Sequence, residues 1–317
     1  MRVLIALGGN AMTSADGRAR PEDQRAAVAG AMRTVADLVA DGVEVVLTHG
    51  NGPQVGNLLV KNEIAADVVP AVPLDWCGAQ TQGSIGVLIL NALDSALARR
   101  GAATRSAVLV SRTLVDPTDR HFASPSKPIG RYLTSDEAAA LIEHGQVCRD
   151  RGERGWRRVV ASPRPREFLE LAAARALLAS GHVVVCAGGG GVPVVRGADG
   201  EFHGADAVVD KDLTAAMLAA ELDVDVLVIA TDVDAAVAGW GTPAARPIGE
   251  VGVAELAALA ADGHFADGSM GPKVEAACRF AERGGRAVIT SLHRIAEALR
   301  GDAGTIVNPV KVREGGY

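Results

Sequence analysis

The segment VEVVLTHGNGPQVGNLL, residues 43–59, decides the fold class of this chain. Its first part, 43–48, is mostly β-branched or apolar and predicts a buried strand. Gly50-Asn51-Gly52 then form a tight turn, and Pro53 favours the start of a helix. A strand that passes directly into a helix begins a βαβ unit. The glycine turn has two explanations: it only turns the chain, or it leaves room for a ligand against bare backbone.

Strand-like and helix-like segments alternate along most of the chain. Beyond the opening segment, strands are expected at 2–7, 107–111, 182–187, 225–230, 286–290 and 304–307. Helices are expected at 22–41, 79–100, 167–180, 213–222, 272–283 and 293–300. This alternation predicts an α/β fold with a mainly parallel central sheet that is covered by helices on both faces.

Residues 112–166 interrupt the alternation. They contain several prolines and many arginines, including the segments PSKPIG and ERGWRR. We expect a protruding lid subdomain at 112–166, inserted into a single domain that spans 1–317. The alternative is a long irregular loop, which is uncommon at this length unless it is functional.

Composition excludes several classes of function. A net charge of −6 and 3% aromatic residues argue against a nucleic-acid-binding surface. No segment has the length and hydropathy of a membrane span or a signal sequence, so we expect a cytoplasmic protein with no membrane partner. Cys77, Cys148, Cys186 and Cys278 lack metal-ligand spacing and are expected to be buried thiols. No metal-ligating residues are predicted.

Small or acidic residues follow four of the expected strands. Ligands of open α/β sheets bind beyond the carboxyl ends of the strands, so these loops are candidate binding sites. They are Gly8-Gly9-Asn10, Gly50-Asn51-Gly52, the run from Gly188 to Gly191, and Thr231-Asp232-Val233-Asp234. Glycine lets backbone N–H groups converge on an anion, which favours phosphate binding over purely structural turns. The sequence lacks the P-loop motif, and its glycine runs do not fit the dinucleotide fingerprint.

Lysines are rare among the 32 basic residues, and three of them have unusual neighbours. Lys127 lies in SPSKPIG, Lys211 lies between two aspartates, and Lys273 follows a glycine-proline turn. Compact ammonium groups suit the charge that spreads over the oxygens of a transferring phosphoryl group. Phosphoryl transfer needs positioning and charge neutralisation, and we find no Ser/His/Asp or Cys/His set that would favour nucleophilic catalysis.

Long motifs in the same order then resemble the carbamate kinase family of the amino acid kinase superfamily. They include IALGGNAM, THGNGPQVGNLL, QTQGSIG, GGGGVPVV, VVDKDLTAAMLA and GHFADGSMGPKVEAACRF, and the resemblance runs from Met1 to about Val307. It implies a three-layer α/β/α sandwich with an eight-stranded central sheet, a lid and a homodimer. It also implies reversible transfer between ATP and carbamate to give ADP and carbamoyl phosphate, with Mg²⁺, often toward ATP in arginine or purine catabolism.

The resemblance also implies roles for individual residues. Gly8, Gly9 and Asn10 are expected along the β- and γ-phosphates of ATP/ADP, and Gly50, Asn51 and Gly52 around carbamate. Lys127 is expected to replace a lysine that many superfamily kinases carry just before the first glycine loop, where this chain has Ala6. Asp210 is expected to hold Lys211 and Lys273 by ion pairing, with Lys211 at the transferred group. The remaining expected nucleotide contacts are Gly188, Gly189, Thr231, Asp232, Val233, Asp234, Met270 and Gly271.

One segment departs from the family pattern. Where carbamate kinases usually carry a Val-Tyr pair followed by Asn, this chain has Ala236, Val237 and Gly239. The expected consequence is the loss of an aromatic side chain near adenine or ribose. Two alternatives remain: another amino acid kinase acting on a carboxylate or phosphonate, and a catalytically inactive nucleotide-sensing paralogue, which is supported only by this segment.

Overall fold

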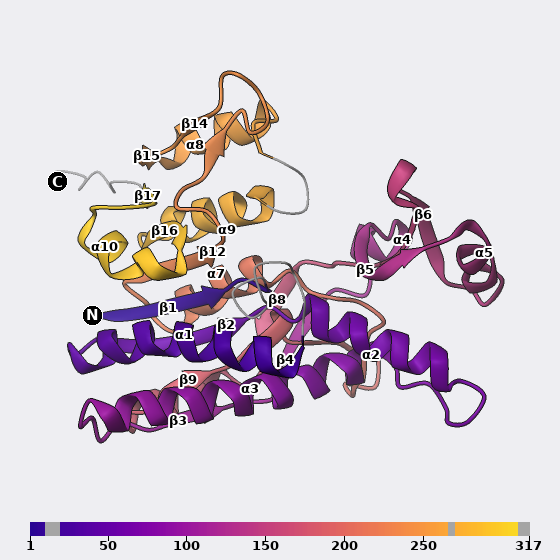
Figure 1. Cartoon of the computed structure of the whole chain (residues 1–317), viewed down its shortest axis with the longest axis horizontal. Helices are drawn as coiled ribbons and strands as arrows, with labels where there is room; N and C mark the ends of the chain where they lie inside the picture. Colours follow the sequence, from indigo (N-terminus) through magenta and orange to yellow (C-terminus); the bar gives the residue numbers. More distant parts are fainter. Residues whose placement is uncertain (10–19, 266–269, 310–317) are drawn as a thin grey trace.

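An eight-stranded sheet forms the centre of the molecule (Figure 1). The computed structural model describes residues 1–9, 20–265 and 270–309. The strand order is β15-β17-β16-β12-β1-β2-β9-β3, and all neighbours are parallel except β16 and β17. These strands are β1 Arg2–Leu7, β2 Glu44–His49, β3 Ser106–Val108, β9 Val183–Val185, β12 Val226–Thr231, β15 Glu250–Gly252, β16 Arg286–Ser291 and β17 Thr305–Asn308. The predicted parallel α/β sheet is confirmed.

Helices cover both faces of this sheet because its strands are apolar on both sides. In β1, Val3 and Ile5 face one core, and Leu4 and Ala6 face the other. The first core is closed by α1 Pro21–Ala40, α3 Leu74–Arg99 and α10 Ile295–Arg300. The second is closed by α6 Leu171–Ala179, α7 Lys211–Glu221, α8 Val253–Ala261 and α9 Met270–Glu282. The result is the three-layer α/β/α sandwich that the family resemblance implied.

A smaller unit projects from the sandwich beside α2, which spans Gly52–Ala65 (Figure 1). Its sheet has the order β5-β7-β6 and carries α4 and α5. These elements are α4 Arg120–Ala123, β5 Lys127–Leu133, α5 Ser135–Glu143, β6 Val147–Asp150 and β7 Trp156–Val160. They lie inside the segment that was expected to form the lid.

The two ends of that segment lie outside the projecting sheet. β4 Arg112–Val115 and β8 Pro165–Phe168 pair with each other in a separate four-stranded sheet with β10 Val192–Arg196 and β11 Phe202–Gly204. A short pair, β13 Val237–Ala238 and β14 Arg246–Pro247, follows β12. The structure therefore limits the projecting unit to the chain between β4 and β8.

Most predicted elements are found within a few residues of their expected bounds, but three differ. The helix expected at 167–180 begins only at Leu171, because the preceding residues form β8. The helix expected at 79–100 begins earlier, at Leu74, where buried Cys77 adds to the apolar side of α3. The strand expected at 107–111 ends at Val108.

The four cysteines are free and buried, as expected. None of the helices that the structure describes combines the length and apolar character of a membrane span.

Candidate active site

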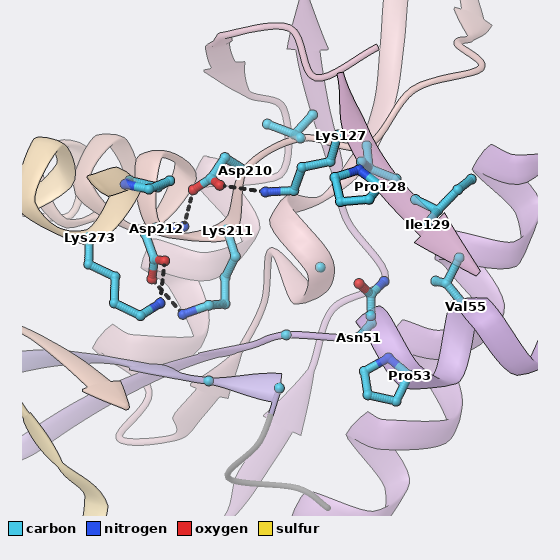
Figure 2. Close-up of a pocket in the computed structure, with 18 of the residues that line it drawn as sticks. Asn51, Pro53, Val55, Lys127, Pro128, Ile129, Asp210, Lys211, Asp212 and Lys273 are labelled. Atoms are coloured by element: carbon cyan, nitrogen blue, oxygen red, sulfur yellow. Dashed lines mark hydrogen bonds and ion pairs between the residues drawn. The ribbon is translucent and has the colours of Figure 1, made fainter. Parts of the chain in front are cut away.

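A cavity of about 570 Å³ lies where the carboxyl ends of the central strands meet the projecting sheet (Figure 2). Loops from distant parts of the sequence converge on it, as strand-end loops of a parallel sheet do. Of the predicted site residues it is lined by Gly8, Gly9, Gly50, Asn51, Gly52, Lys127, Gly189, Asp210, Lys211, Thr231, Asp232 and Lys273. The glycine loops and the three rare lysines thus belong to one site.

Five other predicted residues lie elsewhere, and one is not described. Val233 and Met270 line a smaller adjoining cavity, and Gly271 lines a groove between α7, α8 and α9. Gly188 packs on His49, and Asp234 accepts a hydrogen bond from Ser291 outside both cavities. Asn10 falls outside the described residues.

Asp212 holds two of the lysines. Its two carboxylate oxygens accept from Lys211 Nζ at 2.6 Å and from Lys273 Nζ at 2.9 Å (Figure 2). The expectation that Asp210 makes these ion pairs is wrong. The sequence placed an aspartate on each side of Lys211, and only the turn into α7 decides which carboxylate faces the lysines.

Asp210 instead connects the helix to the projecting sheet. It is the N-cap of α7, and its Oδ1 accepts from the backbone N–H groups of Asp212 and Leu213. Its Oδ2 accepts from Lys127 Nζ at 2.8 Å. Lys127 begins β5, so this ion pair fixes the base of the projecting sheet against the mouth of the cavity.

Asp212, Lys211 and Lys273 are buried together, so the charge of each affects the pKa values of its neighbours. Burial alone would raise the pKa of Asp212, but the ammonium groups of Lys211 and Lys273 hold it at about 2. Burial lowers the pKa of Lys211, Asp212 opposes this shift, and Lys273 adds to it. At neutral pH the Asp212 carboxylate is ionised, and it holds the Nζ atoms of Lys211 and Lys273 side by side at the cavity wall.

The N-terminus of α2 forms the opposite wall. Asn51 is its N-cap residue but makes no side-chain cap, and Pro53 lies in the first turn as predicted. The first N–H groups of a helix without such a cap can bind an anion. The Gly50-Asn51-Gly52 loop packs closely against the loop after β1. A Cβ at Gly50 would lie 2.9 Å from Gly9 N, so only glycine fits at this position.

His49 is a packing residue. It is 1% exposed, and burial lowers its pKa to about 4. The imidazole is therefore neutral at physiological pH. It packs so closely on Gly188 that a Cβ there would clash with His49 Nε2.

Comparison with known proteins agrees with this geometry. The sequence profile of the amino acid kinase family matches residues 1–291. The chain belongs to the amino acid kinase family. It is 45% identical to the carbamate kinase of Thermococcus kodakarensis, over 96% of this chain and 98% of that protein. It is 42% identical to the carbamate kinase-like protein YahI of Escherichia coli K12, over 96% of this chain and 97% of that protein.

A solved amino acid kinase has nearly the same fold. The carbamate kinase from Giardia lamblia bound to AMP-PNP superimposes with a TM-score of 0.92 at 41% identity, and 98% of each chain is covered. This likeness extends over the central sandwich and the projecting sheet together. The architecture described above, including the projecting sheet, is therefore shared with this carbamate kinase.

The smaller cavity, about 220 Å³, adjoins the lysine-lined one in this amino acid kinase. Thr231, Asp232 and Lys273 line both cavities. The sequence predicted that an aromatic side chain is missing at Val237, and this residue lines the smaller cavity. Aromatic side chains nonetheless line this cavity, namely Trp240 and Phe265.

Sequence reasoning missed several cavity residues. Asp212 lies in the motif VVDKDLTAAMLA directly after Lys211, and Trp240 directly follows Gly239, so their positions beside these residues were the available signal. Arg157 lines the cavity from β7, and Pro128, Ile129 and Gly130 line it from β5. Their proximity depends on how the projecting sheet folds back, for which the sequence holds no local signal.

The lining residues that the structure describes form no cluster of three metal ligands. Among the described residues, the one group of three carboxylate or imidazole ligands close enough to share an ion is Asp199, Glu201 and His203. These residues are exposed, and none of them lines the cavity.

Proposed function

We propose that this amino acid kinase is a carbamate kinase, which reversibly transfers a phosphoryl group between ATP and carbamate to give ADP and carbamoyl phosphate. One observation carries the proposal. The Lys211–Asp212–Lys273 cluster faces the Gly50-Asn51-Gly52 loop across a single cavity whose third side is Lys127. The full-length identity to carbamate kinases supports the same substrate pair.

The cavity residues account for the transfer by position and charge. In a loose transition state the charge lies on the oxygens of the transferred phosphoryl group. Lys211 neutralises this charge, while Lys273, beside the nucleotide cavity, neutralises the charge that develops on ADP. The N-terminus of α2 and the backbone N–H of Gly9 hold the remaining oxygens, because the N–H of Gly8 donates to the carbonyl of Ala230. Carbamate is already an anion, so the neutral, buried His49 is not needed as a base.

The nucleotide extends from the lysines into the smaller cavity. Its phosphates lie between Gly9 and Lys273, and its base lies toward Trp240 and Phe265. Mg²⁺ bound with the nucleotide would be held mainly by phosphate oxygens and would supply further charge neutralisation.

The projecting sheet acts as a lid. Lys127 is anchored to Asp210 in this structure, and we assign it to the β- and γ-phosphates when nucleotide binds. The protein is proposed to be a cytoplasmic homodimer. Its physiological direction is proposed to be ATP synthesis from carbamoyl phosphate, as in the catabolism of arginine or purines.

A panel of acceptors tests the proposal. ADP formation from ATP and Mg²⁺ is followed with carbamate, with small carboxylates and with phosphonates. Carbamate should give the fastest turnover. Faster turnover with a carboxylate or phosphonate would identify another kinase of this family, and nucleotide binding without turnover would identify a sensing paralogue.

A further inference from the structure

The side-chain amide of Asn51 is held in one position at the cavity wall. Its Nδ2 donates to Thr81 Oγ1 at 2.9 Å. Its other face packs on the glycine loop, where a Cβ at Gly189 would lie 2.5 Å from Asn51 Cγ. Gly189 also has a φ of +67°, a conformation that favours glycine. The amide is thus confined between α3 and the glycine loop.

Thr81 determines which end of the amide faces the cavity. Its hydroxyl proton is donated to the carbonyl of Gly78 at 2.7 Å. A hydroxyl has only one proton, so toward Asn51 it presents a lone pair. Only the NH₂ end of the amide can bond to it. Thr81 is 1% exposed, so water does not compete for this arrangement.

Asn51 Oδ1 is therefore left as a hydrogen-bond acceptor. Asn51 lines the cavity, and in Figure 2 its oxygen lies on the side of Lys211. The cavity also presents donors, namely the Nζ groups of Lys211 and Lys273 and the N–H groups of Gly9 and of the start of α2, while the carboxylates of Asp210 and Asp212 already accept from lysines. These donors match the oxygens of the acceptor and of the phosphoryl group, whereas Oδ1 matches none of them.

We propose that Asn51 Oδ1 accepts a hydrogen bond from the amino group of the substrate, and that Thr81 is the positioning residue that sets this orientation. The site thereby selects a carbamoyl group over an acetyl group of nearly the same shape. This inference rests on the proposed function. A methyl group cannot donate, so an acetyl substrate leaves Oδ1 without a partner, and sites built to bind an N–H discriminate strongly against analogues that lack it.

The test is the ratio of kcat/KM for carbamoyl phosphate to that for acetyl phosphate, measured as ATP formation from ADP. Thr81→Val keeps the shape but removes the lone pair that orients the amide. It should lower the ratio about tenfold, the scale of one buried hydrogen bond. Thr81→Ser keeps the hydroxyl and should restore the ratio. The KM for ADP should be unchanged in both variants.

Two further variants separate positioning from general damage. Thr290→Val removes a buried hydroxyl that has no hydrogen-bond partner among the described residues, and it should leave the ratio at the wild-type value. In an Asn51→Ala background, Thr81→Val should change the ratio no further, because Thr81 acts through Asn51.

The outcomes distinguish this inference from the proposed function. If the wild-type protein makes no ATP from carbamoyl phosphate, the proposed function fails. If it makes ATP but Thr81→Val leaves the ratio unchanged, or lowers it equally in the Asn51→Ala background, the role of Thr81 and Asn51 is overturned.

Discussion

Asp212 is the residue on which the lysine cluster depends. Its side chain is 6% exposed, and those of Lys211 and Lys273 are 11% and 15% exposed. Removing one partner from a buried ion pair leaves an uncompensated charge, which is strongly destabilising. Substitution of Asp212 alone would leave two uncompensated charges, those of Lys211 and Lys273.

Asp212→Asn should therefore reduce the free energy of unfolding by about 3 kcal/mol or more and abolish turnover. Asp210→Asn is the matched control, because asparagine can still cap α7 and Lys127 is partly exposed, so its cost should be below about 1 kcal/mol. Urea unfolding of both variants at pH 7 measures the difference. Equal losses would show that the two aspartates share the lysines.

His49 gives the stability of the protein a pH dependence. Its pKa is about 4 in the folded chain, below its ordinary value of 6.5, so the unfolded chain binds this proton first as the pH falls. The free energy of unfolding should therefore decrease as the pH falls from about 6.5 to about 4. Between pH 7 and pH 5 the contribution of His49 is about 2 kcal/mol.

Urea unfolding at several pH values tests this contribution. His49→Gln should flatten the pH dependence in this window, while His144→Gln, at an exposed position, should not. A wild-type slope in the His49→Gln variant would contradict the shifted pKa.

Strand β5 carries Lys127, the cation that links the projecting sheet to the site. Lys127 is 32% exposed, so its substitution should change stability little. Lys127→Ala should lower kcat by about 10²-fold, the usual cost of losing one donor to the transition state. Steady-state kinetics compare it with Lys61→Ala, which removes an exposed lysine of α2. Near-wild-type turnover of Lys127→Ala would contradict its assigned role.

Most helices and strands of the central sandwich could be predicted from the sequence. The central strands were predicted by apolar runs such as 225–230, because a sheet that is buried on both faces needs apolar residues on both sides. The helices were predicted by helical periodicity, as at 272–283. The start of α6 could not be predicted, since Pro165–Phe168 pairs with the distant β4 and no local pattern records that partner. The same holds for Asp210 and Asp212, which flank Lys211: the two aspartates have identical chemistry, and only their positions at the start of α7 assign their roles.

For the molecule as a whole, the order of the sheet creates the site. β1, β2 and β12 are neighbours, so loops that are far apart in sequence end at one edge. α7 and α9 pack on the same side and bring Lys211 and Lys273 to Asp212. The glycine loops and lysines were predictable from the sequence. The positions of Arg157 in the larger cavity and of Trp240 in the smaller cavity could not be predicted, because both depend on the folding of distant segments.

The most direct test of the proposed function is ³¹P nuclear magnetic resonance of the wild-type protein with ADP, Mg²⁺ and carbamoyl phosphate. The carbamoyl phosphate signal should be replaced by the γ-phosphate signal of ATP, and this exchange should be lost in Asp212→Asn. Carbamoyl phosphate that decays only to inorganic phosphate, at the rate seen without protein, would contradict the proposed function.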